Sequence, residues 1–182
     1  MNAKSHFHRM QKKVVLFIAA SLDGFIAKED GNIDWLTRYE SKNEDYGFKS
    51  MFARIGTVIV GGNTYRQVKD DYQGKPAYLF SRKKIVDAPP NIHVVQGSVK
   101  AFFKKLKLDD QKPIWLIGGG ELVRQFLEAG LIDEFIITYV PILLGKGIPL
   151  FHASHSPISL ELIQSKKYPN GLVQLHYVRT KK

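Results

Sequence analysis

Two apolar segments of the chain each run into a turn built from glycine and polar residues. Residues 14–20 form the first apolar run and precede the turn at 21–24, while residues 114–117 form the second and precede the glycines at 118–120. An uninterrupted apolar run of this length is typical of a strand that is buried on both faces. Glycine lets a ligand approach the backbone closely, because no side chain intervenes. The two turns therefore predict one ligand cleft at the edge of a central sheet.

The glycine turn at 118–120 lies between a predicted strand and a predicted helix, which suits a phosphate or pyrophosphate. Free N–H groups and the positive end of the dipole at a helix start attract such an anion. The same glycines also suit a tight turn with close helix packing, and the sequence leaves both interpretations open. The spacing matches neither the Rossmann fingerprint nor a Walker loop. Two further candidate anion sites follow other predicted strands, at residues 61–64 and at Ser81-Arg82.

Hydrophobic periodicity predicts the elements that position these turns. We expect strands at 13–20, 57–60, 77–80, 92–95, 114–117, 135–140, 160–163 and 172–178. Helices alternate with strands early in the chain, and consecutive strands follow late. This order predicts an α/β fold whose sheet is mostly parallel with an antiparallel edge.

Capping and turn signals set the limits of the helices and loops. Residues 43–54 look helical, and a short helix begins at Asn63 or Thr64 with a capping box that ends at Gln67. Ser98 begins a third helix, and a fourth carries apolar residues 122–127 and stops near Gly130. Residues 21–36 are expected to form a long loop, and Asn170-Gly171 predicts a hairpin.

Length and charge restrict the classes of protein that this chain can belong to. Its 182 residues are most simply one domain at 13–182, behind a flexible tail at 1–12. The net charge of +10 comes from scattered lysines, which favours a solvated surface or attraction of an anionic ligand over nucleic-acid binding.

Several kinds of site and compartment are not expected. There are no cysteines, which excludes disulfides and thiolate metal sites. No segment reaches the roughly 18 apolar residues that span a bilayer, so we expect a cytoplasmic protein without membrane contact. His152 and His155 lack a third ligand, so no metal site is expected.

Five segments occur in the order seen in the dihydrofolate-reductase-like superfamily, at 21–27, 62–65, 81–82, 118–122 and 141–151. The chain most resembles the reductase domain of the bifunctional riboflavin-biosynthesis deaminase-reductase and its stand-alone bacterial relatives. The resemblance implies a three-layer fold with a central sheet of about eight strands and NADPH across its carboxyl edge. It further implies hydride transfer to a pterin- or pyrimidine-like heterocycle, and a homodimer that forms through the 135–151 region.

The same resemblance implies roles for individual residues. Asp23, Trp35 and Thr138 would face the substrate, and the proton would come from Asp45, Asp23 or a water that they orient. Glu44 and Glu40 are alternatives to Asp45, and these acids would also suit the start of a helix without any catalytic role. The cofactor would contact a larger set of residues, namely Ala20, Gly62, Asn63, Thr64, Ser81, Arg82, Gly118, Gly119, Gly120, Glu121 and Leu122.

Two departures from the family pattern bear on function. Asn63 stands where the family often has an arginine for the 2′-phosphate, so Arg82 or Arg66 would have to replace it. Phe25 stands where the riboflavin-pathway enzymes commonly have lysine, which argues against a ribosylaminopyrimidine phosphate as substrate. The alternative function is therefore a nucleotide-binding or sensing protein of the same fold that catalyses weakly.

Overall fold

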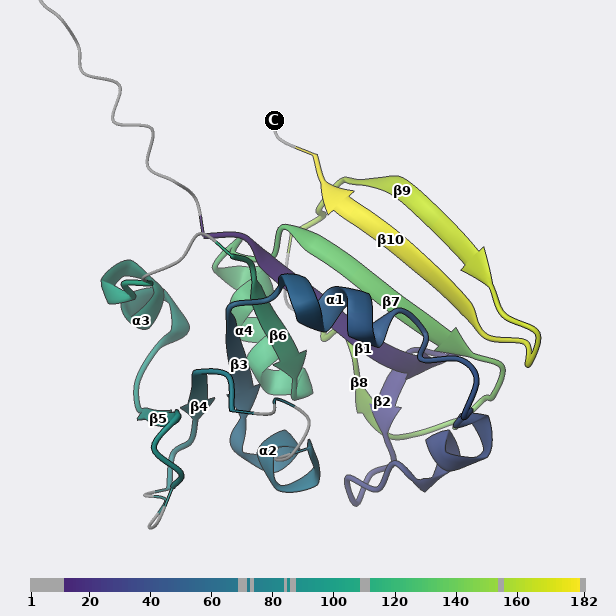
Figure 1. Ribbon diagram of the computed structural model, residues 1–182, viewed down its shortest axis with the longest axis horizontal. Helices are drawn as coiled ribbons and strands as arrows, with labels where there is room; N and C mark the ends of the chain where they lie inside the picture. The colour runs from purple at the N-terminus through teal and green to yellow at the C-terminus, as the bar shows by residue number, and fades with distance from the viewer. Residues whose placement is uncertain are drawn as a thin grey trace, which may run out of the picture.

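The computed structural model describes residues 12–68, 72, 74–83, 85, 88–108, 112–153 and 156–180. The predicted tail at 1–12 lies outside these residues except for Lys12. Within them, eight strands form one sheet in the order β5-β4-β3-β6-β1-β7-β10-β9 (Figure 1). The strands are β1 (Val14–Ser21), β3 (Thr57–Gly61), β4 (Ala77–Phe80), β5 (Ile92–Val95), β6 (Ile114–Gly118), β7 (Glu134–Val140), β9 (Leu160–Lys167) and β10 (Val173–Arg179).

Neighbouring strands from β5 across to β7 pair in parallel, whereas β10 pairs antiparallel with β7 and with β9. The predicted mostly parallel sheet with an antiparallel edge is therefore confirmed. The hairpin between β9 and β10 is also confirmed, because the Gly171 amide donates to the Tyr168 carbonyl at 3.0 Å and Gly171 has φ +89°. That positive φ explains why glycine stands at this turn.

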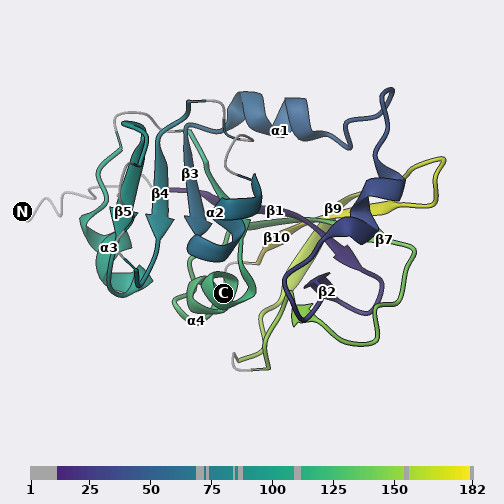
Figure 2. The ribbon, with the colours of Figure 1, turned by 90° about the horizontal axis from the view of Figure 1, so that it is seen from below.

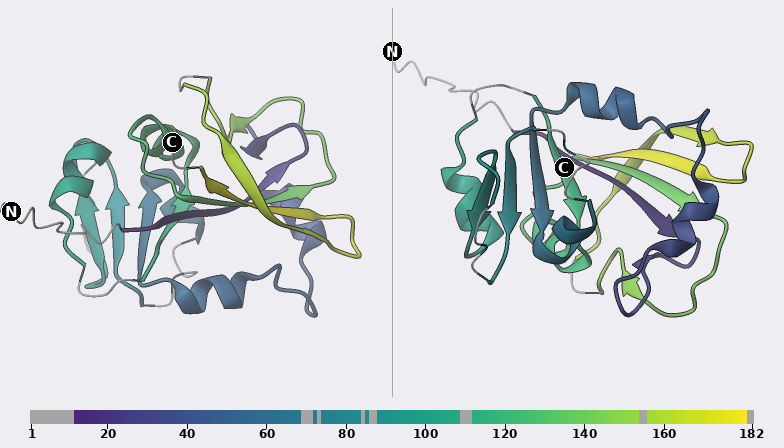
Figure 3. Two further views of the ribbon diagram at one scale, coloured as in Figure 1. Left: turned by 90° about the horizontal axis from the view of Figure 1, so that it is seen from above. Right: turned by 60° about the horizontal axis from the view of Figure 1, so that its bottom comes forward.

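Helices cover both faces of the sheet, which gives three layers (Figures 2 and 3). Helices α3 (Val99–Lys105) and α4 (Gly120–Glu128) pack on one face, in the same core cluster as Val14 and Leu16 of β1. Helices α1 (Phe48–Arg54) and α2 (Gly62–Val68) pack on the other, together with Val15. Successive residues of β1 thus reach opposite cores, as a strand buried on both faces requires.

Two helix ends match their sequence signals. The Ser98 hydroxyl accepts a hydrogen bond from the Ala101 amide at 3.2 Å, so Ser98 caps α3 as predicted. Gly130 follows α4 with φ +66°, and its amide donates to the Leu127 carbonyl at 2.9 Å. Both signals depend on neighbours in the sequence, which is why the sequence alone revealed them.

Two helix predictions are wrong at their N-terminal ends. The predicted helix at 43–54 begins only at Phe48, because Tyr46 and Gly47 adopt left-handed backbone angles with φ +53° and +82°. The predicted capping box is absent, because α2 already begins at Gly62. The Gln67 side chain instead donates to the Gly31 carbonyl, a contact between distant parts of the chain.

The segment 21–36 contains more structure than the long loop that was predicted. Strand β2 (Phe25–Ala27) pairs with the short strand β8 (Ile148–Pro149), and the 3₁₀ helix η1 (Asp34–Tyr39) follows. A side chain at Gly147 would collide with the Ala27 carbonyl, so β2 and β8 approach through a glycine. The described residues include no helix long and apolar enough to cross a membrane.

Candidate functional site

Three of the turns that the sequence singles out, after β3, β4 and β6, meet at the carboxyl edge of the parallel strands. A Cβ built on Gly119 would lie 3.1 Å from the Thr64 hydroxyl oxygen and 3.9 Å from the Gly61 Cα. A Cβ built on Gly62 would lie 3.5 Å from the Ser81 hydroxyl oxygen. The structure therefore brings together the turns after β3, β4 and β6, which are far apart in the sequence.

The start of α4 offers free backbone donors at this edge. Gly119 is its N-cap residue, and no side chain of the described residues caps the helix. Gly118 and Gly119 have φ +127° and +95°, backbone angles that other residues rarely adopt. Uncapped N–H groups at a helix start, with the positive end of the dipole, fit a phosphate group.

Gly120 serves packing instead. A Cβ there would approach the Pro149 carbonyl oxygen to 2.7 Å and the His152 Nε2 to 3.1 Å. Both interpretations of the glycine turn thus hold, at different residues. The side chain of Glu121 is bound by Arg124 at 2.8 Å, and this guanidinium lowers the pKa of Glu121 to about 2. Only the backbone of Glu121 is therefore available to an anion.

The residues after β3 and β4 contribute cations to the same edge. The Ser81 hydroxyl closes its own turn, donating to the Lys83 carbonyl at 2.8 Å and accepting from the Lys83 amide at 3.1 Å. Arg82 is exposed and makes no hydrogen bond or ion pair with any residue that the structure describes. The guanidinium of Arg66 donates to the Asn63 side chain at 2.7 Å, so a cation lies beside the position where the family often has arginine.

Asp23 ties the turn after β1 to the loop after β7. Its carboxylate accepts hydrogen bonds from the Ser21 hydroxyl at 2.6 Å, from the Gly145 amide at 2.7 Å and from the Leu144 amide at 3.2 Å. Desolvation raises the pKa of Asp23, but these hydrogen bonds together outweigh it and lower the pKa overall. The carboxyl is ionised at neutral pH and carries no proton to donate.

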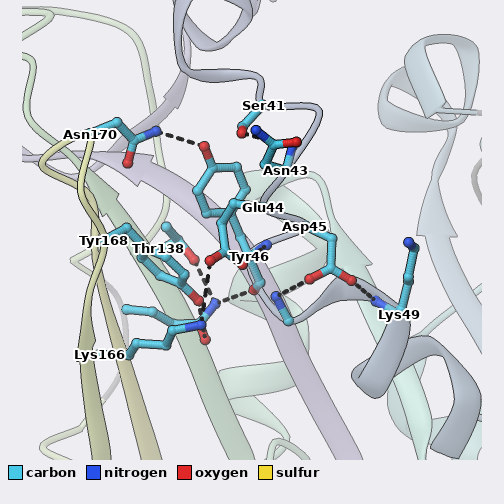
Figure 4. Close-up of polar contacts among 12 residues, drawn as sticks. Ser41, Asn43, Glu44, Asp45, Tyr46, Lys49, Thr138, Lys166, Tyr168 and Asn170 are labelled. Atoms are coloured by element: carbon cyan, nitrogen blue, oxygen red, sulfur yellow. Dashed lines mark hydrogen bonds and ion pairs between the residues drawn. The ribbon is translucent and has the colours of Figure 1, made fainter.

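Asp45 lies just before α1 and is held in a similar way (Figure 4). Its carboxylate accepts from the Lys49 amide at 2.9 Å and from the Gly47 amide at 3.1 Å, and these bonds lower its pKa. Glu44 pairs with Lys166 at 3.7 Å. The interpretation as a partner of a helix start fits the geometry of Asp45, and the catalytic roles of Asp45 and Asp23 stay predictions.

The two predicted substrate residues lie on the same face of the sheet. Thr138 of β7 stands opposite Ala19 of β1 and is only 6% exposed. Trp35 of η1 is 3% exposed and packs in one cluster with Val140 and Ala19. Its indole N–H has no hydrogen-bond acceptor among the described residues. The side chain of Ala20 is buried in the core, so only its backbone is available at the edge.

Gln174 of β10 was not expected to belong to this site. Its amide nitrogen donates to the Thr138 hydroxyl oxygen and to the Tyr46 carbonyl, both at 2.9 Å. The Tyr46 hydroxyl in turn donates to the Tyr39 carbonyl and accepts from the Asn170 side chain at 2.6 Å. The sequence signal was a polar residue inside the mostly apolar segment 172–178, which also contains His176.

Two surface hollows lie on loops and not over the glycine turns. One, of about 420 Å³, is lined by 41–45 and Lys49. The other, of about 350 Å³, is lined by 28–30, Leu144 and Lys146. The candidate cofactor edge is defined by its backbone donors and glycines.

The three layers, the strand order and the carboxyl edge define a dihydrofolate-reductase-like α/β fold. The sequence profile of the RibD C-terminal domain matches residues 12–174, and the chain belongs to this family.

Relatives cover nearly the whole chain. The uncharacterized protein YwjB of Bacillus subtilis (strain 168) is 42% identical, over 93% of this chain and 99% of its own length. A crystal structure of a protein provisionally assigned to riboflavin biosynthesis, from Shewanella sp. PV-4, is 32% identical with a TM-score of 0.77, covering 93% of this chain and 99% of that one. RibD of Acinetobacter baumannii shares the fold at 22% identity with a TM-score of 0.66, covering 94% of this chain and 59% of that one.

Proposed function

We propose that this chain is an NADPH-dependent reductase that transfers hydride to a C=N or C=O bond of a pterin- or pyrimidine-like heterocycle. One observation carries the proposal: the uncapped start of α4 lies beside Thr64, at the same sheet edge where Gly62 lies beside Ser81. Bound NADPH would supply the hydride. The protein's own task is to position the two rings and to exclude water.

The cofactor residues divide by the part of NADPH that they suit. Backbone N–H groups of 119–121 bind the diphosphate at the start of α4. Arg82 and Arg66 are the guanidinium groups that can hold a 2′-phosphate, because both are exposed beside this edge. The net charge of +10 favours approach of such a polyanion.

Proton delivery follows from the state of the two carboxyls. Asp23 and Asp45 accept backbone hydrogen bonds and are ionised at neutral pH. An ionised carboxylate orients a water or accepts a proton, so the proton that completes the reduction reaches the substrate through water. Trp35 and Thr138 supply the polar contacts on the substrate side.

The test is the melting temperature with NADPH, NADH and NADP⁺ side by side. A ligand that binds only the folded state stabilises it, by about 2.7 kcal/mol at a hundredfold excess over Kd. We expect a larger rise with NADPH than with NADH, and expect the double variant Arg66→Ala/Arg82→Ala to remove that difference while keeping the NADH response. No rise with any of the three nucleotides would contradict the proposal.

The second candidate is a nucleotide-binding or sensing protein that catalyses weakly. The observations that favour it are that Asn63 and Phe25 stand where the family commonly has arginine and lysine, and that backbone amides hold the carboxylates of both predicted acids. NADPH binding without NADPH oxidation, across a panel of dihydropterins and pyrimidinones, would support this function over the reductase.

We also propose that the protein forms a homodimer through β9. Both edges of β7 are occupied, by β1 and β10, whereas β9 is the edge strand and every one of its residues is exposed. Its exposed apolar side chains include Leu160, Leu162 and Ile163. Glu161 lies near one end of β9 and Lys167 at the other. If β9 of a second copy pairs antiparallel with it, Glu161 of each copy lies opposite Lys167 of the other.

A further inference from the structure

We propose that Gln174 selects the ligands of the substrate side by fixing the direction of the Thr138 hydroxyl. The inference rests on the proposed function, since it takes Thr138 as a residue of the substrate site. Gln174 would make this site prefer a ligand that presents hydrogen-bond acceptors, such as a ring carbonyl oxygen or an unprotonated ring nitrogen. It is thus a positioning residue that sets specificity through Thr138.

The orientation of the Gln174 amide follows from the two partners of its nitrogen, and its oxygen accepts from the Tyr168 hydroxyl at 3.4 Å. Its nitrogen lies 2.9 Å from the Tyr46 carbonyl oxygen, and a carbonyl can only accept. The NH₂ group must therefore face Tyr46, which settles which end of the amide is nitrogen. The same nitrogen lies 2.9 Å from the Thr138 hydroxyl oxygen, so its second hydrogen goes to Thr138. Thr138 is an acceptor in this bond.

The hydroxyl proton of Thr138 is consequently left for a ligand. A threonine hydroxyl has one proton and two lone pairs, and one lone pair is occupied by Gln174. No described residue accepts that proton. A ligand acceptor would satisfy this buried donor, whereas a ligand N–H could use only the second lone pair and would leave the proton unpaired.

Trp35 gives a second, independent indication of the same preference. Its indole N–H can only donate, is buried, and has no acceptor among the residues that the structure describes. Trp35 packs in one cluster with Val140, which shares a face of β7 with Thr138, and with Ala19, the strand neighbour of Thr138. The Thr138 hydroxyl and the Trp35 indole N–H are thus two unused donors on the same face of the sheet, and they suit a flat heterocycle with two acceptors.

Contacts of Tyr46 fix the direction of its carbonyl, which accepts a hydrogen bond from Gln174 (Figure 4). Its hydroxyl donates to the Tyr39 carbonyl and accepts from Asn170, and its ring meets Tyr168 edge-on with centroids 5.0 Å apart. Its φ of +53° is unusual for a residue other than glycine, and such angles persist where surrounding contacts hold them. The carbonyl of Tyr46 therefore keeps its direction, and Gln174 with it.

The experiment uses two flat bicyclic probes of similar size. Isoquinoline presents one acceptor and no donor, whereas indole presents one donor and no acceptor. Their Kd values would be measured by NMR titration near pH 7.5, with and without saturating NADP⁺. We expect the wild-type protein to bind isoquinoline about tenfold more tightly, since leaving a buried donor unpaired costs about that factor.

Gln174→Glu should weaken or reverse this preference, because a carboxylate accepts the Thr138 proton and turns the hydroxyl into an acceptor only. Gln96→Glu is the matched control, because Gln96 is exposed and follows β5, at the opposite edge of the sheet from β9 and β10, and this variant should leave the preference unchanged. Thr138→Val should reduce the preference to the part that Trp35 supplies, without adding charge, which keeps the test decisive if Gln174→Glu fails to fold.

Three results would overturn the inference: no measurable binding of either probe, tighter binding of indole by the wild-type protein, or the wild-type preference in folded Gln174→Glu. Failure of NADP⁺ to bind, with the probe preference intact and weakened or reversed by Gln174→Glu, would count against the proposed function alone.

Discussion

Gly62→Ala separates a cofactor role of the glycine turns from a packing role. The added Cβ would lie 3.5 Å from the Ser81 hydroxyl oxygen and 3.6 Å from the Phe80 carbonyl oxygen, which is ordinary van der Waals contact. Gly62 does not have a left-handed φ and begins α2. Alanine should therefore fold normally here, and in a helix it is favoured over glycine by up to about 0.5–1 kcal/mol.

The same methyl group would stand between two residues that are proposed to hold the cofactor. If the methyl group shifts NADPH so that one hydrogen bond to a charged phosphate is lost, about 1.5–3 kcal/mol of binding free energy is lost with it. Since each ~1.4 kcal/mol is a factor of ten, Kd should rise by at least about tenfold. Isothermal titration calorimetry with NADPH would give Kd, and the melting temperature without ligand would report stability.

Ser50→Ala is the matched control, because Ser50 is an exposed, neutral position on α1, away from the sheet edge. It should leave Kd unchanged and keep the fold. Wild-type affinity in a folded Gly62→Ala protein would refute the cofactor role of this turn. A marked fall in the melting temperature of Gly62→Ala would instead show that the glycine is needed for packing.

Two further predictions concern the loops and the edge strand. Asp23→Asn should lower the melting temperature at neutral pH. Because folding lowers the pKa of Asp23, the difference in melting temperature from the wild-type protein should be fully present above the ordinary pKa of 3.8 and shrink as the pH falls through the lowered folded-state pKa. A difference that does not depend on pH would contradict this. Leu162→Lys should convert the proposed dimer to a monomer, as measured by light scattering. Leu143→Lys is the control and should leave the dimer intact, because Leu143 is 70% exposed but distant in the sequence from β9. A monomeric wild-type protein would refute the interface.

The sheet and its glycine turns could be predicted because their signals are local. An apolar run such as 114–117 and the glycines that follow it indicate a buried strand and its end without reference to the rest of the chain. Parallel pairing then brings the ends of β1, β3, β4 and β6 to one edge. That step needs only the alternation of strands and helices, which the sequence also shows.

The errors arise where partners distant in the sequence determine local structure. Gln67 suits a capping box, but its side chain is recruited by the Gly31 carbonyl, 36 residues away. The error at 43–47 also has a local cause, because Asn43, Asp45 and Gly47 are weak helix formers. Gln174, 128 residues from Tyr46, donates to the carbonyl of Tyr46 in this non-helical segment.

The position of Gln174 shows why the substrate side is harder to derive than the cofactor side. A phosphate is bound by backbone N–H groups, and glycine in the sequence marks where backbone is exposed. A heterocycle is selected by the direction of individual hydroxyl and N–H groups, and that direction depends on the second partner of each group. Thr138 alone can donate or accept; only its bond to Gln174, itself oriented by Tyr46, makes it a donor to a ligand. In this proposal, ligand specificity depends on the hydrogen bonds that connect Thr138 of β7, Gln174 of β10 and Tyr46 before α1. None of these residues, taken alone in the sequence, predicts that specificity.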